Sequence, residues 1–169
     1  MTGTATERYI ERLATLKNGE LTLLRNHSGR PLDRSVEGFD LFTGLWWPLR
    51  QESQRAPRRE VAWLVAKLFA GAQISHSPGR SLARQLACTL PGTTSERQRF
   101  RFRIDEMLVC SLADIEPSLR WALDRVARGK LSLDWVLLVD DLSVWDGGTV
   151  QLKWAEEFLT EMGILEAKR

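Results

Sequence analysis

Apolar residues recur along this chain at intervals of three and four, which is the spacing of one face of an α-helix. The clearest stripe occupies five positions: Val61, Leu64, Val65, Leu68 and Phe69. Pro57 stands where the first turn of a helix tolerates proline, and Gly71 stands where a helix commonly stops. The pattern predicts a buried amphipathic helix between these two residues.

Similar stripes predict further helices along the rest of the chain. They cover residues 6–18, 20–26, 39–47, 80–90, 96–104, 117–128 and 132–142, followed by a last helix. Gly19 and Pro48 are expected to stop the first and third of these. The expected N-terminal caps are Thr94 or Ser95, Asp114, Ser132 and, for the last helix, Thr149. The inward-facing residues of the last helix are expected to be Leu152, Phe158 and Leu159. Eight or nine helices joined by short loops predict an all-α fold.

The strongest break in this pattern is the segment TLPGTTS, residues 89–95, where Pro and Gly follow a helix. It predicts two small helical bundles packed together, an N-terminal lobe of residues 1–90 and a C-terminal lobe of residues 91–169. Directly after it, ERQRFRFRI admits a second interpretation. As a strand it would align its arginines on one face, whereas as a helix they divide into i, i+4 pairs on opposite sides. The helical neighbours favour the helix.

Charge is unevenly distributed along the chain. Residues 1–129 hold 20 Lys and Arg against 14 Asp and Glu, whereas residues 130–169 hold 4 against 8. Most of the basic residues are Arg, whose planar fork of donors matches phosphate oxygens. A basic face on a protein of net charge +2 can bind a polyanion at one place. Seven Trp are also present, and several are expected at lobe or subunit interfaces.

The sequence lacks the usual signatures of catalysis. His27 and His76 lie in Gly/Ser/Pro loops away from metal-ligand spacing, and phosphate-binding glycine loops are absent. Asp140 and Asp141 are expected to form part of a solvated acidic face. The protein is therefore expected to be a non-enzyme without a metal or cofactor. Cys88 and Cys110 are expected to be buried, reduced thiols. No segment reads as a signal peptide or membrane span, which predicts a cytoplasmic protein.

Clusters of arginine are the candidate functional residues. They gather before the helix at residue 61, at the start of the helix 80–90, and within ERQRFRFRI. The candidate nucleic-acid-binding residues are Arg25, Arg55, Arg58, Arg59, Arg80, Arg84, Arg97, Arg99, Arg101, Arg120, Arg125 and Arg128, with Arg50 and Arg103 in the same groups. Such residues would contact backbone phosphates, without sequence preference. The alternative is that nearby acids such as Glu52 and Glu96 neutralise them.

Six segments in order resemble the CasB family, the small subunit of the type I-E CRISPR Cascade complex. They are LKNGELTLLR (16–25), WLVAKLFAG (63–71), GRSLARQLA (79–87), ERQRF (96–100), SLRWAL (118–123) and LDWVLLVDDLSVWDGGTVQLKWAEEF (133–158). The resemblance implies an all-helical protein with no catalytic role. It implies association with a second copy, with backbone CasC-type and large CasA-type subunits, and with a crRNA-bearing particle. It also implies binding of target DNA, including the displaced single strand of the R-loop, in antiviral defence.

The resemblance bears on individual residues too. It matches basic family positions at Arg25, in the stretch Arg55–Arg59, and at Arg84, Arg97, Arg99 and Arg120. Arg84 is equally interpretable as a structural residue that anchors the two lobes. The turn Trp145–Thr149 lacks the basic residues that some relatives carry, so a DNA contact there is not expected. Two other functions stay open: a helical scaffold whose arginines serve protein contacts, and a helix-turn-helix regulator that uses the helix 80–90.

Overall fold

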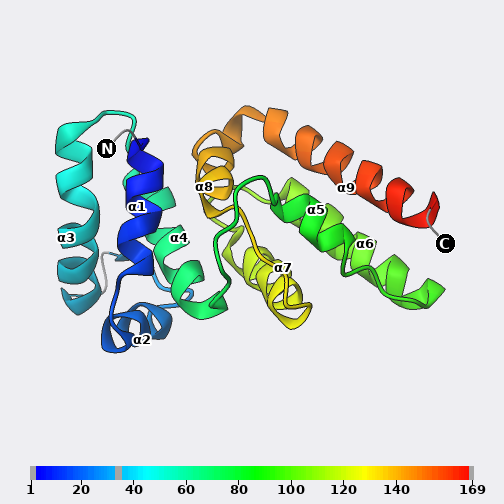
Figure 1. The fold of residues 1–169 in the computed structure, drawn as a ribbon, viewed down its shortest axis with the longest axis horizontal. Helices are drawn as coiled ribbons and strands as arrows, with labels where there is room; N and C mark the ends of the chain where they lie inside the picture. Colours follow the sequence, from blue (N-terminus) through cyan, green and yellow to red (C-terminus); the bar gives the residue numbers. More distant parts are fainter. Residues whose placement is uncertain (1–2, 33–35, 168–169) are drawn as a thin grey trace. The chain divides into compact units, whose positions relative to one another are not determined.

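The computed structural model describes residues 3–32 and 36–167, and within these residues it contains nine α-helices and no strand (Figure 1). A single isolated bridge between His76 and Leu133 is the one extended pairing in the described part of the chain. The predicted all-α fold is confirmed.

The helices belong to two separate units, Met1–Gln73 and Ile74–Arg169. The first contains α1 (Ala5–Ala14), α2 (Asn18–Asn26), α3 (Val36–Glu52) and α4 (Arg59–Ala72). The second contains α5 (Leu82–Ala87), α6 (Thr94–Val109), α7 (Glu116–Arg128), α8 (Trp135–Ser143), the short 3-10 helix η2 (Trp145–Gly147) and α9 (Thr149–Ala167). This boundary precedes α5, whereas the sequence suggested a boundary after it. The reason is packing, because α5 lies against α7 and α9.

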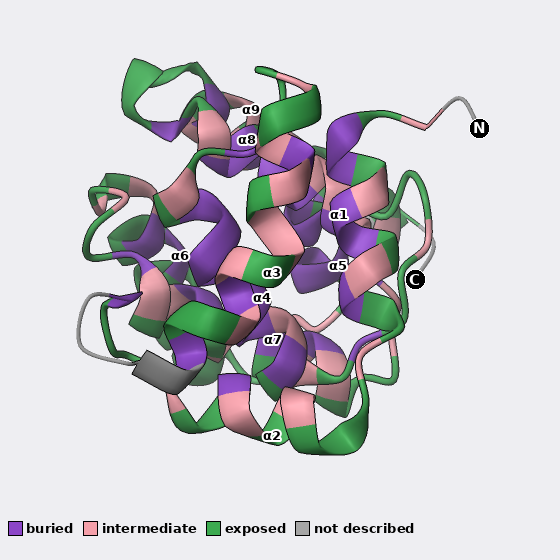
Figure 2. Ribbon diagram, turned by 90° about the vertical axis from the view of Figure 1, so that its left-hand side faces the viewer, coloured by how far each residue is buried: buried purple, intermediate pink, exposed green. Residues whose placement is uncertain are grey.

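Helix α4 is the core element of the first unit, and it is buried along most of its length (Figure 2). Four of its five predicted core residues are buried, and Phe69 is half-buried. The Tyr9 hydroxyl of α1 donates a hydrogen bond of 2.6 Å to the Ala62 carbonyl, and burial raises the pKa of Tyr9. Apolar burial and this buried hydrogen bond together fix α1 against α4.

Two helix ends that the sequence predicted in the first unit, at Gly19 and at Pro48, are wrong. Gly19 lies inside the first turn of α2, and α3 continues through Pro48 to Glu52. Proline removes one backbone donor and crowds the preceding turn. The bond that Pro48 cannot make would have run to the Gly44 carbonyl. The Arg12 guanidinium of α1 donates to the adjacent Leu45 carbonyl at 3.2 Å, so it ties α1 to α3. Pro57 lies before the α4 N-cap, Arg58, so it is outside the helix.

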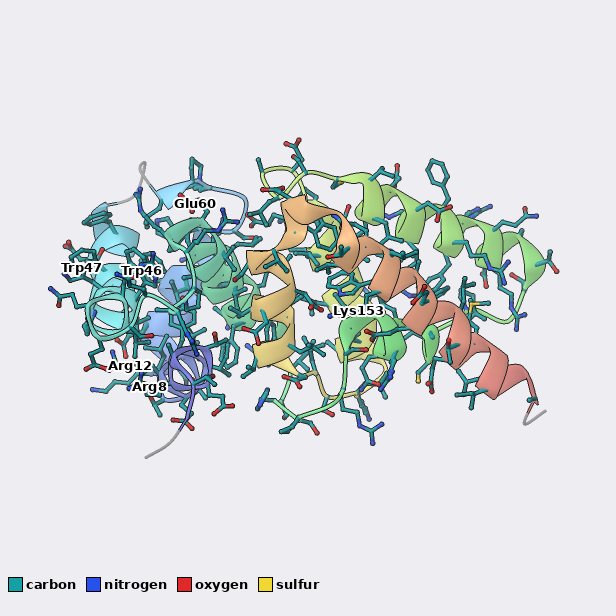
Figure 3. The ribbon with its side chains drawn as sticks, turned by 90° about the horizontal axis from the view of Figure 1, so that it is seen from above. Arg8, Arg12, Trp46, Trp47, Glu60 and Lys153 are labelled. Atoms are coloured by element: carbon teal, nitrogen blue, oxygen red, sulfur yellow. The ribbon has the colours of Figure 1, made fainter. Side chains whose placement is uncertain are left out.

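Most of the tryptophans stabilise the unit to which they belong. Five indole N–H groups donate to oxygen atoms of the same unit: Trp46 to Pro57, Trp63 to Arg30, Trp135 to Ile74, Trp145 to Cys110 and Trp154 to Asp141. The side chain of Trp47, labelled with Trp46 in Figure 3, is 48% exposed.

The burial of Asp141 and of both cysteines differs from the prediction. Asp141 is buried, and its carboxylate accepts from Lys153 (labelled in Figure 3) at 2.5 Å and from Trp154 at 2.8 Å. Asp140 remains exposed. Cys88 is exposed and Cys110 half-buried, so neither is the buried thiol expected.

Both histidines have structural contacts beyond a solvated loop. Nδ1 of His27 lies 2.7 Å from the Leu23 carbonyl at the end of α2. His76 is exposed, and its Nδ1 accepts a hydrogen bond from the backbone N–H of Trp135 at the start of α8.

The predicted caps are displaced by one or two residues. Thr93 caps α6 and Asp134 caps α8, each with a side-chain oxygen that accepts a backbone N–H in the first turn. Helix α7 begins after Ile115, and Asp114 instead accepts from the Ser111 hydroxyl. Short polar residues cluster at these starts, so the sequence indicates the cap region more reliably than the capping residue.

The inward face of α9 differs from the predicted one. Val150, Trp154, Phe158 and Met162 are buried, whereas Leu152 and Leu159 are 63% and 62% exposed. These two leucines lie seven residues apart and form an apolar stripe on the outside of the helix.

This assignment predicts a large loss of stability when Phe158 is truncated and almost none when its neighbour Leu159 is truncated. Phe158→Ala should lower the free energy of unfolding by about 3–5 kcal/mol, because it removes a buried ring and leaves a cavity. Leu159→Ala should change it by less than about 0.5 kcal/mol, because Leu159 is exposed. Urea denaturation followed by circular dichroism measures both, and equal losses would contradict the assigned face.

Candidate nucleic-acid interface

Helix α6 carries several of the candidate nucleic-acid-binding arginines. The segment ERQRFRFRI lies within it, so the helical interpretation of this segment is confirmed. Phe100, Ile104 and Met107 are its buried residues, at the spacing of one helical face. The arginines therefore divide as a helix requires. Arg99 and Arg103 turn toward α7, whereas Arg101 is exposed outside the hollow that these two help to line.

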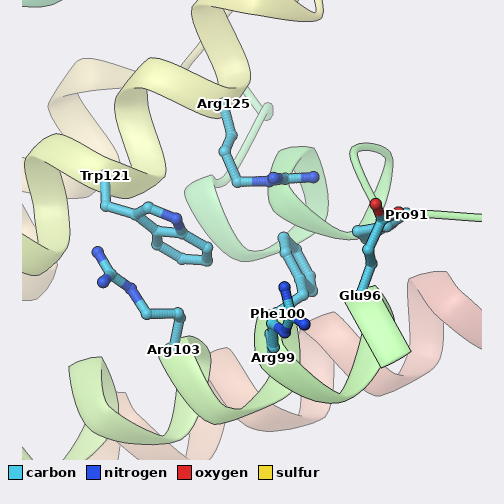
Figure 4. Close-up of a pocket in the computed structure, with 7 residues that line it drawn as sticks. All are labelled: Pro91, Glu96, Arg99, Phe100, Arg103, Trp121 and Arg125. Atoms are coloured by element: carbon cyan, nitrogen blue, oxygen red, sulfur yellow. The ribbon is translucent and has the colours of Figure 1, made fainter. Parts of the chain in front are cut away.

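Arg99 and Arg103 line an open hollow between α6 and α7 (Figure 4). Its volume is about 370 Å³, and its full lining is Pro91, Glu96, Arg99, Phe100, Arg103, Trp121 and Arg125. Three guanidinium groups therefore meet one carboxylate around two aromatic rings. Such a site attracts a single anionic group, because the cations outnumber the acid.

The aromatic rings hold two of these guanidinium groups in place. Trp121 lies between Arg103 and Arg125, whose Cζ atoms are 5.0 Å and 5.8 Å from its ring centroid (Figure 4). Arg125 also lies 4.6 Å from the ring centroid of Phe100. The Phe100 and Trp121 centroids are 5.5 Å apart. Distances below about 6 Å are those of cation–π attraction, so the rings of Trp121 and Phe100 favour these positions of the Arg103 and Arg125 guanidinium groups.

A second hollow of about 480 Å³ adjoins the first, because Trp121 and Arg125 line both. Its further lining includes Arg128 and Asp124, whose side chains form an exposed ion pair of 3.0 Å. An exposed pair of this kind is weak, so Arg128 can exchange its partner for a phosphate at little cost. The first hollow, between α6 and α7, is hereafter the α6–α7 groove, and the second lies between α7 and the residues that follow α5.

Arg125 links this groove to the loop before α6. Its Nε donates to the Thr89 hydroxyl at 3.2 Å and its Nη2 to the Thr89 carbonyl at 2.5 Å. Burial, followed by the charge of Arg128, lowers the pKa of Arg125, while Asp124 and Glu96 oppose this shift. Arginine nevertheless stays protonated. Arg125 therefore combines a structural role with a fixed positive charge.

Several other predicted arginines are engaged in holding the fold. Arg25 donates to the Ala70 carbonyl at 3.2 Å, and Arg97 to the Pro91 carbonyl at 2.7 Å. Arg84 is exposed and lies 3.9 Å from the Glu157 carboxylate in the same unit. Arg50 donates to the Gln54 and Ala56 carbonyls of its own loop. The candidate arginines are thus divided between structural and surface groups.

The remaining candidates are at the surface. Arg55, Arg58, Arg80, Arg101 and Arg120 are exposed, and Arg59 is half-buried. Arg55, Arg58 and Arg59 stand at the entry to α4 in the first unit, so they form a basic group separate from the groove. Sequence reasoning missed Phe100, Glu96 and Trp121 as groove residues. The spacing of Trp121 and Arg125, four apart on one helix, was the available signal.

Among residues 3–32 and 36–167, no group of three or more His, Cys, Asp or Glu is arranged to hold a metal ion. Within the same residues, no helix has both the length and the apolar character to cross a bilayer.

These features define an all-helical protein with an arginine-lined surface groove. The family model of CRISPR-associated protein Cse2 matches residues 20–159, and the chain belongs to this family, also known as CasB. A CRISPR-associated protein Cse2 of Thermus thermophilus is 35% identical over 106 residues, which is 62% of this chain. The aligned region spans 59% of the length of that relative.

Solved structures share the fold. The crystal structure of M. ruber CasB matches with a TM-score of 0.77 and 20% identity, over 98% of both chains. A Cse2-family protein of Thermus thermophilus matches with a TM-score of 0.69 and 24% identity, over 90% of this chain and 94% of the other. A chain of E. coli Cascade bound to a PAM-containing dsDNA target matches at 0.68 and 20%, over 95% and 99%.

The division of arginines predicts different costs of removing two near neighbours on α6. Arg97→Ala should destabilise the protein by about 1 kcal/mol or more, because it removes the bond to the Pro91 carbonyl. Arg99→Ala should change stability by less than about 0.5 kcal/mol, because its side chain is exposed in the groove. Denaturant titration of both variants measures the difference. A larger loss for Arg99→Ala would contradict the division.

Proposed function

We propose that this chain is the non-catalytic small subunit of a type I-E CRISPR Cascade complex, and that it binds nucleic acid without sequence preference through the α6–α7 groove. Membership of the Cse2 family supports the assignment to Cascade, as does the shared fold with a chain of E. coli Cascade bound to a dsDNA target. The groove itself, with Arg99, Arg103 and Arg125 around Trp121, is the observation that carries the binding proposal.

The chemistry of the groove suits a phosphate backbone. Guanidinium groups donate in a planar fork to phosphate oxygens and release condensed counterions when they do so. Contacts to phosphate position a strand and convey no sequence, which suits a complex whose guide RNA reads the target by base pairing. Because exchange of a DNA duplex for an RNA–DNA hybrid is nearly balanced, backbone contacts to target DNA and the displaced strand can stabilise the R-loop.

The remaining basic residues extend the same proposal. Arg55, Arg58, Arg59, Arg80, Arg101 and Arg120 would add phosphate contacts outside the groove. Assembly with CasC-type and CasA-type subunits and with a second copy requires protein contacts. The exposed Leu152 and Leu159 stripe on α9 supports such contacts, since exposed apolar patches commonly mark interaction sites.

Charge reversal in the groove is expected to weaken binding. Arg99→Glu with Arg103→Glu should lower affinity for a random-sequence DNA strand at least about tenfold, because it removes charge-assisted bonds. The slope of log affinity against log salt should become shallower by about 1–2. Fluorescence anisotropy of the full chain across a salt series measures both. As a matched comparison of single reversals on one helix, Arg101→Glu, outside the groove, should lower the affinity less than Arg99→Glu alone.

Two results would contradict this proposal. An equal effect of Arg101→Glu would mean that binding is diffuse rather than localised in the groove. Unchanged DNA affinity combined with loss of copurification with the crRNA-bearing particle would favour the scaffold function, in which the arginines serve protein contacts.

Removal of the acid in the groove should have the opposite effect. Glu96 shares the hollow with three arginines, so Glu96→Gln should strengthen DNA binding about twofold to fivefold by removing one repulsive charge. The gain should shrink as salt rises, because screening weakens the repulsion. The same anisotropy series measures it. Weaker binding by Glu96→Gln would show that the strand does not pass through this hollow.

A further inference from the structure

We propose that Trp121 is a positioning residue that turns the α6–α7 groove into a clamp for individual backbone phosphates. This inference rests on the proposed function, since it assigns to one side chain the preparation of the phosphate-binding groups.

The first argument is the placement of two guanidinium groups on one indole. Arg103 comes from α6 and Arg125 from α7, yet both lie within 6 Å of the Trp121 ring centroid. Figure 4 shows Trp121 between them. Tryptophan is the aromatic side chain that attracts cations most strongly. A single residue thereby aligns positive groups from two helices along one hollow.

The second argument is that this arrangement reduces the loss of side-chain entropy when the arginines bind a ligand. A solvated arginine has many rotamers and loses them when it grips a ligand, whereas a stacked guanidinium is already restricted. Arg125 is further fixed by its two hydrogen bonds to Thr89. The groove therefore offers phosphate donors in place before a strand arrives.

The third argument is the indole N–H of Trp121. Trp46, Trp63, Trp135, Trp145 and Trp154 each donate to a protein oxygen. Trp121 is half-buried, lines both hollows, and makes no such hydrogen bond with any described residue. Its donor is available to a phosphate oxygen in the same space that the guanidinium groups line. A tryptophan needed for packing alone would not have to line both hollows.

The fourth argument is continuity along a strand. Trp121 and Arg125 are common to the two hollows, and Arg128 lines the second. A chain whose phosphates occupy successive hollows would pass over Trp121 at their junction. This places Trp121 at the centre of the track rather than at its edge.

The decisive experiment keeps the charge and changes the shape. Arg103→Lys preserves a positive charge but loses the planar group that stacks on the indole. It should lower affinity for a labelled random-sequence DNA strand about threefold to tenfold. Trp121→Leu should lower it about tenfold, and Trp121→Phe only about twofold to threefold, because a ring remains while the indole N–H donor is lost. The full chain is used, with circular dichroism to confirm folding.

A double-mutant cycle tests the coupling directly. Arg103→Lys should have little further effect when Trp121 is already Leu, since the stacking has been lost. Trp47→Leu removes an exposed tryptophan elsewhere and should leave affinity unchanged. Full affinity in Arg103→Lys and Trp121→Leu, with binding lost in the Arg99 and Arg103 charge reversal, would refute the clamp and leave the proposed function intact. Full affinity in all three variants would refute the groove as the binding site.

Discussion

The packing of the buried Phe100 ring is the contact on which the α6–α7 groove depends. The ring is 3% exposed and packs against Trp121 of α7 at 5.5 Å and Phe158 of α9 at 5.8 Å between centroids. This contact fixes the rotation of α6 about its axis. Since a helix places neighbours about 100° apart, fixing Phe100 inward also fixes where Arg99 and Arg103 point. The apolar core of the second unit thus determines the position of its positive charges.

The arginines divide between two physical tasks, and the partner that each guanidinium group meets decides which one it performs. Where a guanidinium reaches an otherwise unpaired carbonyl, as Arg25 and Arg97 do, leaving that carbonyl unpaired would destabilise the fold. Where the side chain lies over an aromatic ring in an open hollow, as Arg103 does, its donors remain directed toward solvent and any ligand. Arg125 does both, so it connects the stability of the loop before α6 to the shape of the groove.

The sequence predicted the helical fold well and the site only in part, for identifiable physical reasons. The stripe beginning at Val61 was predictable because its period admits one buried face. The last helix offered two stripes of similar spacing, and the wider aromatic surface of Trp154 and Phe158, rather than Leu152 and Leu159, lies in the core. Proline alone could not reveal that α3 continues, because the packing of the whole helix offsets the one bond that Pro48 removes.

The division of the arginines into structural and surface groups could not be predicted from the sequence for a different reason, because it depends on partners that are far apart in the chain. Arg25 finds the carbonyl of Ala70, and Arg103 finds the ring of Trp121, only after helices have packed. The pairing of α6 with α7 also brings Glu96 into the hollow. This acid limits the attraction of the groove for anions in general. Three guanidinium groups opposed by one carboxylate still attract an anion, and a ligand with repeated phosphates binds more tightly than a single small anion because its linked contacts reinforce one another. The polyanionic strand proposed as the ligand has such repeated phosphates.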